Sequence, residues 1–328
     1  MSSPSYFLNL ALLYVCELFA VAWYVDRRSD TQVRRSPRWR GLVYALTLTV
    51  YCSAWTFYGA VGSASVSPWS HAPIYLGPIL VFLFAWPMLR RLRLLGTRHR
   101  VTSIADYLGA RFGKRQGLSM LVTLVTLVTL VTLVTLVAAA SVLSYIALQF
   151  RALIQAWLVV AGQDPQNTLL RADSGLTIAI LLAVFTLFFG ARRMDGRERH
   201  QGMMTAVALE SVVKLIAFLF VALLALIYLR QPDISSALAS PLQPLGGIEL
   251  SADFFARTLI AACAIFCLPR QFHVLVVEAQ EDTDTRLSRW LLPVCLLVFM
   301  VMTVPVSLAG NYLSALSLGG PISPDIYV

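Results

Sequence analysis

Long apolar runs separated by short polar segments dominate the pattern of this chain. A helix needs about 20 mainly apolar residues to cross a bilayer. By that measure the pattern predicts about eight transmembrane helices, at residues 6–24, 41–63, 74–89, 118–157, 175–189, 203–229, 252–268 and 290–308. We therefore expect an all-α polytopic membrane protein.

Residues 51–63, YCSAWTFYGAVGS, differ from the other apolar stretches because they are rich in small residues and hydroxyl groups. In lipid, a helix gives up backbone hydrogen bonds only where the freed carbonyls face protein or a water-filled cavity. Transporters use such breaks near the middle of the membrane to bind ions and solutes. Small residues also let two helices approach closely. The stretch therefore predicts either a tight packing face or a broken helix with an ion or solute site.

A second interruption falls at Pro269, in the sequence CLPRQFHVLVVEAQEDTD. Proline removes a hydrogen-bond donor and clashes with the preceding turn, so carbonyls near Phe266 should be freed. This segment is either a second broken helix or the cytoplasmic end of the span 252–268. Two interrupted segments in corresponding places are typical of inverted-repeat secondary transporters.

The run 118–157 contains a local repeat of Leu-Val-Thr units, with threonine at positions Thr123, Thr126, Thr129, Thr132 and Thr135. A three-residue period does not match the helical turn, so the threonines wind around the helix without forming a polar stripe. We expect their hydroxyls to bond carbonyls of their own helix. The helix would be roughly 60 Å long, against a hydrocarbon core of about 30 Å. It either tilts and projects or breaks near residues 141–144.

Composition agrees with a membrane protein, since 58% of the residues are hydrophobic and 13% are charged. The net charge of +9 comes mostly from arginines in short segments between the apolar runs. The positive-inside rule places these segments in the cytoplasm and the N-terminus outside it, and the charge does not indicate nucleic-acid binding. The five cysteines form no disulfide or zinc pattern. No nucleophile and base pair up as in a soluble enzyme.

Glu210 and Lys214 are the sharpest electrostatic feature of the apolar runs. Ionisable residues in membrane segments are costly and tend to face the bundle interior. Their spacing of four residues, with the acid first, is the favoured orientation of a helical ion pair. The pair either serves structure alone or couples to transport or signalling.

Several motifs together resemble the sodium/solute symporter family: YCSAWTFYGAVGS, VTSIADYLGARFGKR, SYIALQFRAL, FGARRMDGRERHQGMM, ALESVVKLIAF, LPRQFHVLVVE and SPDIYV. More narrowly, the chain is similar to the symporter-like N-terminal half of bacterial sensor histidine kinases. The resemblance implies a leucine-transporter-like fold that is truncated in residues 1–328. Residues 6–24 would be an extra first helix, residues 41–328 would hold core helices, and the C-terminal core helices would be missing.

The resemblance also implies the site residues. Backbone carbonyls near Cys52 and Trp55 would bind a sodium ion, and Ser53 and Thr56 would lie close to the ion or the solute. In the second broken helix, Gln271 and His273 would take part in binding. One departure concerns Tyr51, because amino-acid symporters of this family usually have an acidic residue there.

The implied function is solute sensing, with sodium-coupled uptake of an amino acid or small carboxylate, by the membrane input domain of a two-component sensor histidine kinase. Its partners would be the solute, the lipid bilayer, a kinase domain and a response regulator, and its place would be the bacterial inner membrane. No kinase residues occur in 1–328. The alternatives are the N-terminal fragment of a stand-alone sodium/solute symporter and a non-functional truncated product.

Overall fold

In the computed structural model of the chain, every regular element of the described residues is a helix, in agreement with the all-α prediction. The described residues are 4–29, 37–99, 101, 104, 107, 120–162, 175–180, 183, 201–231, 248, 250–279 and 282–318.

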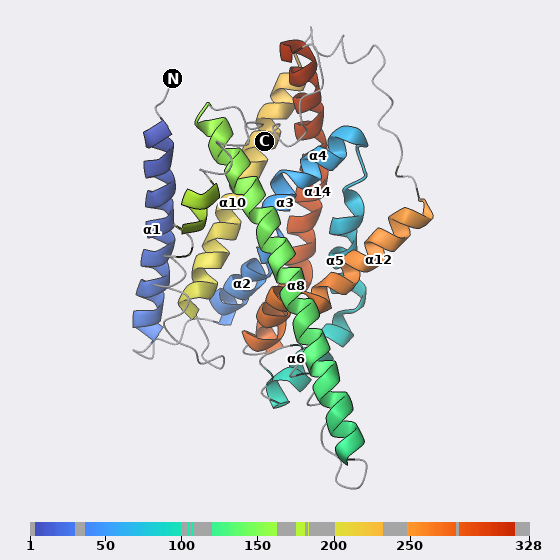
Figure 1. Cartoon of the computed structure of the whole chain (residues 1–328). Helices are drawn as coiled ribbons and strands as arrows, with labels where there is room; N and C mark the ends of the chain where they lie inside the picture. Colours follow the sequence, from blue (N-terminus) through green and yellow to red (C-terminus); the bar gives the residue numbers. More distant parts are fainter. Residues whose placement is uncertain are drawn as a thin grey trace.

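Helix α1 (Pro4–Ser29) stands at one edge of the molecule, where it packs against α10 (Gln201–Leu229) (Figure 1). The predicted first span, 6–24, lies within α1. Most of its described side chains are exposed, as expected of a helix that contacts the bundle along a single side. It lies outside the part of the molecule where the two predicted interruptions meet.

The predicted second span is broken. Helix α2 (Pro37–Thr47) tightens into the 3-10 helix η1 (Leu48–Tyr51) and stops. The chain then restarts as two short helices, α3 (Ala54–Phe57) and α4 (Gly59–Val66). The extended backbone of Cys52 between η1 and α3, with φ −74° and ψ 105°, is where the helix is interrupted. Of the two interpretations of residues 51–63, the structure has the broken helix.

The third predicted span continues beyond its expected end. Helix α5 (Ala72–Phe84) bends by 77° into α6 (Trp86–His99). The arginines at 90–98, which we expected in a loop, therefore lie on a helix. Pro87 stands in the first turn of α6, where a missing N–H removes no helical hydrogen bond, so the proline starts the new helix direction.

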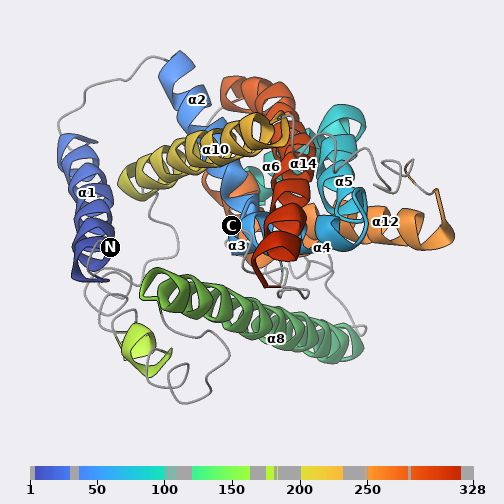
Figure 2. The same cartoon turned by 90° about the horizontal axis from the view of Figure 1, so that it is seen from above.

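Helix α8 (Met120–Val160) is continuous, so of our two alternatives the break near residues 141–144 does not occur. Its 41 residues correspond to roughly 60 Å at the α-helical rise per residue. In both views it lies along the outside of the bundle (Figures 1 and 2). The Thr135 hydroxyl donates to the Val131 carbonyl at 2.8 Å, as we expected of the repeat. The side chains of Thr123, Thr126 and Thr129 lie outside the described residues.

The predicted interruption at Pro269 is also present. Helix α12 (Ala252–Cys267) ends at Leu268, and α13 (Pro269–Phe272) follows at an angle that bends the pair by 55°. The π-helix η2 (His273–Val277) continues directly from α13. π-Helical turns are uncommon and are frequent at functional sites. The segment is thus a second broken helix and does not simply end at the cytoplasm.

The core lies where α14 (Asp282–Leu318) passes between α2, α5 and α10 (Figure 2). Helix α5 also packs closely on α12. A Cβ atom at Gly77 of α5 would lie 2.5 Å from the Ala262 amide nitrogen of α12. Only glycine permits this backbone approach. Helix α12, which leads into the second break, is thereby held against α5, and α5 packs on α14 in the core.

The number of membrane spans differs from the predicted number. Among the described residues, three helices are long and apolar enough to cross a membrane, or up to five if each bent pair is one span. The predicted total of about eight is not confirmed. The predicted span 175–189 lies mostly outside the described residues, although 175–180 and 183 are helical.

Candidate functional site

The first break leaves two backbone carbonyls without their helical partners. The Cys52 N–H donates to the Thr49 carbonyl at 2.8 Å. The Trp55 N–H donates to the Ser53 hydroxyl oxygen at 3.3 Å. Within the described part of the chain, no backbone N–H bonds the carbonyls of Tyr51 and Cys52. The break therefore presents carbonyl oxygens to other groups, as a broken transporter helix does.

Side chains from the second break reach two carbonyls of the first broken helix, those of Leu48 and Tyr51. The Gln271 Nε2 donates to the Leu48 carbonyl at 3.3 Å, and the Arg270 Nη2 donates to the Tyr51 carbonyl at 3.4 Å. These two bonds connect residues 223 and 219 positions apart in the sequence. The Tyr44 hydroxyl adds a bond of 3.0 Å to the Leu275 carbonyl in η2. The two interrupted helices thus contact each other directly.

Arg270 also connects the second break to the long outer helix α8. Its Nη1 donates to the Tyr145 hydroxyl, and its guanidinium carbon lies 4.3 Å from the centroid of the Tyr145 ring. A cation over an aromatic face is attracted by the ring quadrupole. Arg270 therefore holds three segments together: the end of η1, the start of α13 and the middle of α8.

The predicted residues of the first break are largely sealed from solvent. Cys52, Ser53 and Thr56 are buried. Trp55 is partly buried, and its ring lies 6.3 Å from the ring of Tyr75 in α5. Gln271 of the second break is completely buried. Four of the six predicted binding residues therefore lie in the first break, and Gln271 of the second break reaches the first broken helix at the Leu48 carbonyl.

His273, the sixth predicted residue, lies at the start of the π-helix η2 and differs from the others in exposure. Its side chain is 44% exposed, and its Nε2 lies 3.4 Å from Oε1 of the buried Glu278. Within the described residues, Glu278 is its one polar side-chain partner. The structure thus places His273 beside Glu278, two residues beyond Gln271, which reaches the first break.

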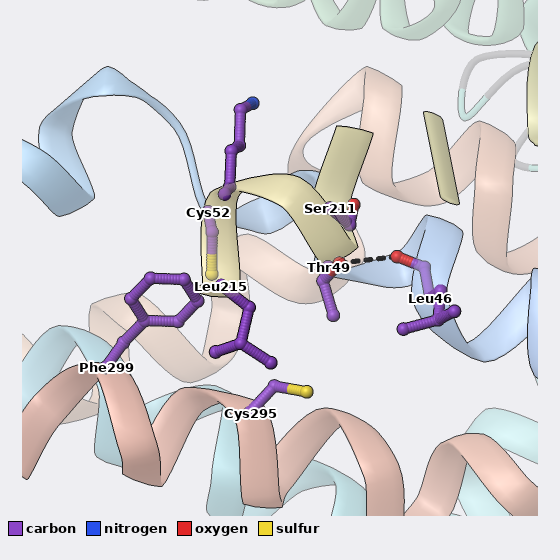
Figure 3. A pocket seen from close by; sticks show the side chains of 8 residues that line it. Leu46, Thr49, Cys52, Ser211, Leu215, Cys295 and Phe299 are labelled. Carbon is purple, nitrogen blue, oxygen red and sulfur yellow. Dashed lines mark hydrogen bonds between the residues drawn. The ribbon is translucent and has the colours of Figure 1, made fainter. Parts of the chain in front are cut away.

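A small pocket opens beside Cys52 (Figure 3). It has room for about one water molecule. Figure 3 shows side chains from the first broken helix, from α10 and from α14 around it. Its lining residues are Leu46, Thr49, Cys52, Ser211, Lys214, Leu215, Cys295 and Phe299. The pocket suits a water molecule or a small ion and is too small for an amino acid.

The Glu210–Lys214 pair lies on α10, one side of this pocket. The Lys214 Nζ is 2.5 Å from Glu210 Oε1, and both side chains are 34% exposed. Lys214 is also a lining residue of the pocket beside Cys52. The pair therefore connects the pocket to the outer face of α10.

Sequence reasoning did not assign roles to several buried polar residues of this region. His71 and Tyr75 are buried at the start of α5, and the His71 Nε2 donates to the Met300 carbonyl at 2.9 Å. Thr303 of α14 is completely buried. Arg270 was noted only as part of the second break, and Tyr145 only as part of a motif. A polar residue within an apolar run was the only sign of these residues in the sequence. Such a residue does not reveal which group it bonds in the folded chain.

The oxygen atoms of the first break are the candidate ligands for a sodium ion. No group of three or more His, Cys, Asp or Glu side chains that could hold a metal ion occurs in the part of the chain that the structure describes. Sodium, however, binds unwound backbone carbonyls in secondary transporters whose helices are broken. The Cys52 carbonyl is an oxygen of this kind, and Ser53 and Thr56 of the same turn add hydroxyl oxygens. Oxygen atoms are the ligands that a sodium ion requires, so these residues fit the ion.

One known family matches the part of the chain that contains the first break. The family model for the sodium:solute symporter family matches residues 38–161. The matched region contains the first break and α8, and ends before the second break. It supports the symporter resemblance over that stretch and does not extend to sensor kinases. No curated protein and no solved structure matches the chain.

Proposed function

We propose that this chain is a solute-binding membrane module that takes up a small solute together with sodium and serves as the input domain of a two-component sensor histidine kinase. The observation that carries the proposal is the contact between the breaks, where Arg270 and Gln271 bond carbonyls of the first broken helix. Paired breaks of this kind form the binding sites of secondary transporters. The symporter family match over residues 38–161 supports the same function.

In this proposal sodium is a co-transported ion that binds at the first break, near Cys52 and Trp55. The Cys52 carbonyl accepts no hydrogen bond from the described residues. The hydroxyls of Ser53 and Thr56 belong to the same turn. Because the pocket beside Cys52 has room for about one water molecule, an ion fits there and the solute binds elsewhere.

The solute, an amino acid or small carboxylate, would bind between the two breaks. Its binding would favour one of two arrangements of the broken helices over the other. A ligand shifts such an equilibrium only by the difference between its affinities for the two states. The long bonds from Gln271 and Arg270, at 3.3 and 3.4 Å, are the contacts whose making and breaking would distinguish the states.

The ion pair on α10 offers a route for coupling within this proposal. Lys214 lines the pocket beside Cys52 and pairs with Glu210. A cation entering the pocket would repel the ammonium group and favour rearrangement of the pair. The alternative role, structural pairing alone, predicts that Lys214→Met changes stability without changing the sodium dependence of binding.

The transport proposal is tested with the full native protein in proteoliposomes. Uptake of radiolabelled amino acids, acetate and succinate is measured with an inward sodium gradient and with an equal potassium gradient. We expect accumulation of at least one solute under sodium only, and its loss in Thr56→Val. Absence of both uptake and binding for the whole panel would refute the proposal.

The kinase part of the proposal is tested on the gene and its product. The protein would lie in the bacterial inner membrane with its N-terminus outside the cytoplasm. The locus is read beyond codon 328, and the native protein is sized by immunoblotting. Kinase sequence and a product much larger than 36.2 kDa support the sensor function. If the sequence beyond codon 328 encodes further helices and no kinase, a stand-alone symporter is favoured. A product of 36.2 kDa would favour a truncated protein.

A further inference from the structure

Arg270 is a cation at the junction of the two breaks, and its partners among the described residues are neutral. Its two terminal nitrogens donate to the Tyr145 hydroxyl and the Tyr51 carbonyl. No carboxylate pairs with it among the residues that the structure describes. Ionisable residues within membrane bundles are costly and mark solute or ion pathways, and they usually pair with one another or with backbone carbonyls. The missing counter-charge is the feature to explain.

A guanidinium suits one kind of counter-ion in particular. Its planar fork of N–H donors binds the two oxygens of a carboxylate in parallel. Arg270 is partly buried and not sealed, so its remaining donors are open to a ligand. A doubly charged phosphate would call for a second cation, but Lys214 already pairs with Glu210. The charge balance therefore favours a single carboxylate.

The neighbouring Gln271 adds a second polar atom without a partner. Its Nε2 donates to the Leu48 carbonyl, while its Oε1 is buried and accepts no hydrogen bond from the described residues. A buried acceptor without a donor is destabilising, because it has lost its bonds to water and gained none in return. An ammonium group on the ligand would satisfy it.

We infer that Arg270 binds the carboxylate of the solute at the junction of the two breaks, and that Gln271 Oε1 accepts a hydrogen bond from the solute's amino group. The solute is then an α-amino acid. This inference rests on the proposed function and assigns the recognition of the solute to two residues of the second break. It leaves sodium to the oxygens of the first break.

The first experiment uses the wild-type full chain in detergent. The standard amino acids, acetate, lactate, succinate and inorganic phosphate are screened by thermal shift, and the tightest ligand is compared with its carboxamide and with its deaminated analogue. We expect an amino acid to bind, and its carboxamide to bind more weakly by on the order of 100-fold. Equal binding of acid and carboxamide, or preference for phosphate, would overturn the inference.

The second experiment changes the arginine itself. Arg270→Gln should weaken binding of that amino acid by on the order of 100-fold. Arg270→Lys, which keeps the charge and loses the fork, should weaken it by about 10-fold. The matched control is Arg257→Gln, since Arg257 is exposed on α12 and already pairs with Asp253 at 2.8 Å.

The outcomes separate the two claims. If wild type binds no solute of the panel, the proposed function fails and this inference fails with it. If wild type binds an amino acid and Arg270→Gln binds it equally well, the inference alone is wrong. If Arg270→Gln is unstable, the comparison of acid with carboxamide in wild type still decides, because it needs no variant.

Discussion

The first break contains no proline, whereas the second has Pro269 at the start of its new helix. Both breaks nevertheless have one extended residue: Cys52 has φ −74° and ψ 105°, and Leu268 has φ −71° and ψ 121°. At Leu268 the following proline enforces this conformation, because it disfavours the helical region for the residue before it. At Cys52 no covalent constraint acts.

The difference shows which break is free to change. The first break is held by contacts: the Ser53 hydroxyl on the Trp55 amide, and two side chains from the second break on the carbonyls of Leu48 and Tyr51. A ligand can replace the contacts that hold the first break. It cannot remove the covalent restriction that Pro269 places on Leu268. We therefore regard the second break as the fixed partner and the first break as the responsive one.

The position of the second break should be most sensitive to a side chain at Gly77. Its added Cβ would lie 2.5 Å from the Ala262 nitrogen and 2.6 Å from the Thr258 carbonyl oxygen, both backbone atoms of α12. We expect Gly77→Ala to lower the free energy of unfolding by about 3 kcal/mol, since overpacking outweighs the better helix propensity of alanine. Thermal unfolding of the purified protein in detergent measures this.

A matched control for that substitution is Gly175→Ala. There the added Cβ would meet the flexible side chain of Ile154, with Cδ1 at 3.0 Å and Cγ1 at 3.9 Å. Its unfolding midpoint should stay close to that of wild type. Equal midpoints for the two variants would show that α5 and α12 do not approach as closely as described.

Gln271→Ala should have the next largest effect, because it removes the bond that connects the fixed break to the responsive one. The completely buried side chain leaves a cavity, and the Leu48 carbonyl loses its donor. A loss of about 2 kcal/mol in stability is expected. Gln231→Ala, at an exposed position after α10, is the control and should be neutral.

Ser53→Ala tests the local support of the first break and should destabilise it by about 1 kcal/mol, as expected for a lost helix cap. The Ser53 hydroxyl accepts from the Trp55 amide at 3.3 Å, at the start of α3. Ser53→Thr keeps the acceptor and should restore most of the stability. If threonine behaves like alanine, the hydroxyl does not cap α3.

Thr135→Val is expected to have the smallest effect, within about 0.5 kcal/mol, because it changes an exposed surface position. The Thr135 hydroxyl bonds a carbonyl that already belongs to its own helix. Unfolding of this variant should superimpose on wild type. A large loss would mean that the Leu-Val-Thr repeat has a packing partner that the described residues do not include.

The existence of both breaks could be predicted from local sequence, because small residues in 51–63 and Pro269 act on their own backbone. The contacts of Arg270 and Gln271 could not be predicted in this way. They depend on residues 219 and 223 positions away and on how α5, α12 and α14 pack. The bend into α6 was missed for a related reason, since its arginines were read as a loop on charge alone.

In α8 the sequence left open a break that the structure does not have. Its length was evident, but we could not decide between a break near 141–144 and a long projecting helix. Regular backbone bonding through that region keeps it whole, and the Ser141 hydroxyl donates to the Val137 carbonyl without interrupting it. A hydroxyl on a helix is a weak signal for a break when it can bond to its own preceding turn.

The most direct test of the central claim is the reactivity of Cys52 itself. In the full chain with its other cysteines replaced by alanine, maleimide labelling of Cys52 is followed with and without sodium and with the amino acids. A second variant that retains only the exposed Cys263 is the control. We predict slow labelling of the buried Cys52, with a rate that changes on adding sodium or solute, and a constant rate for Cys263. A Cys52 rate that responds to neither sodium nor any solute would contradict a ligand-responsive first break.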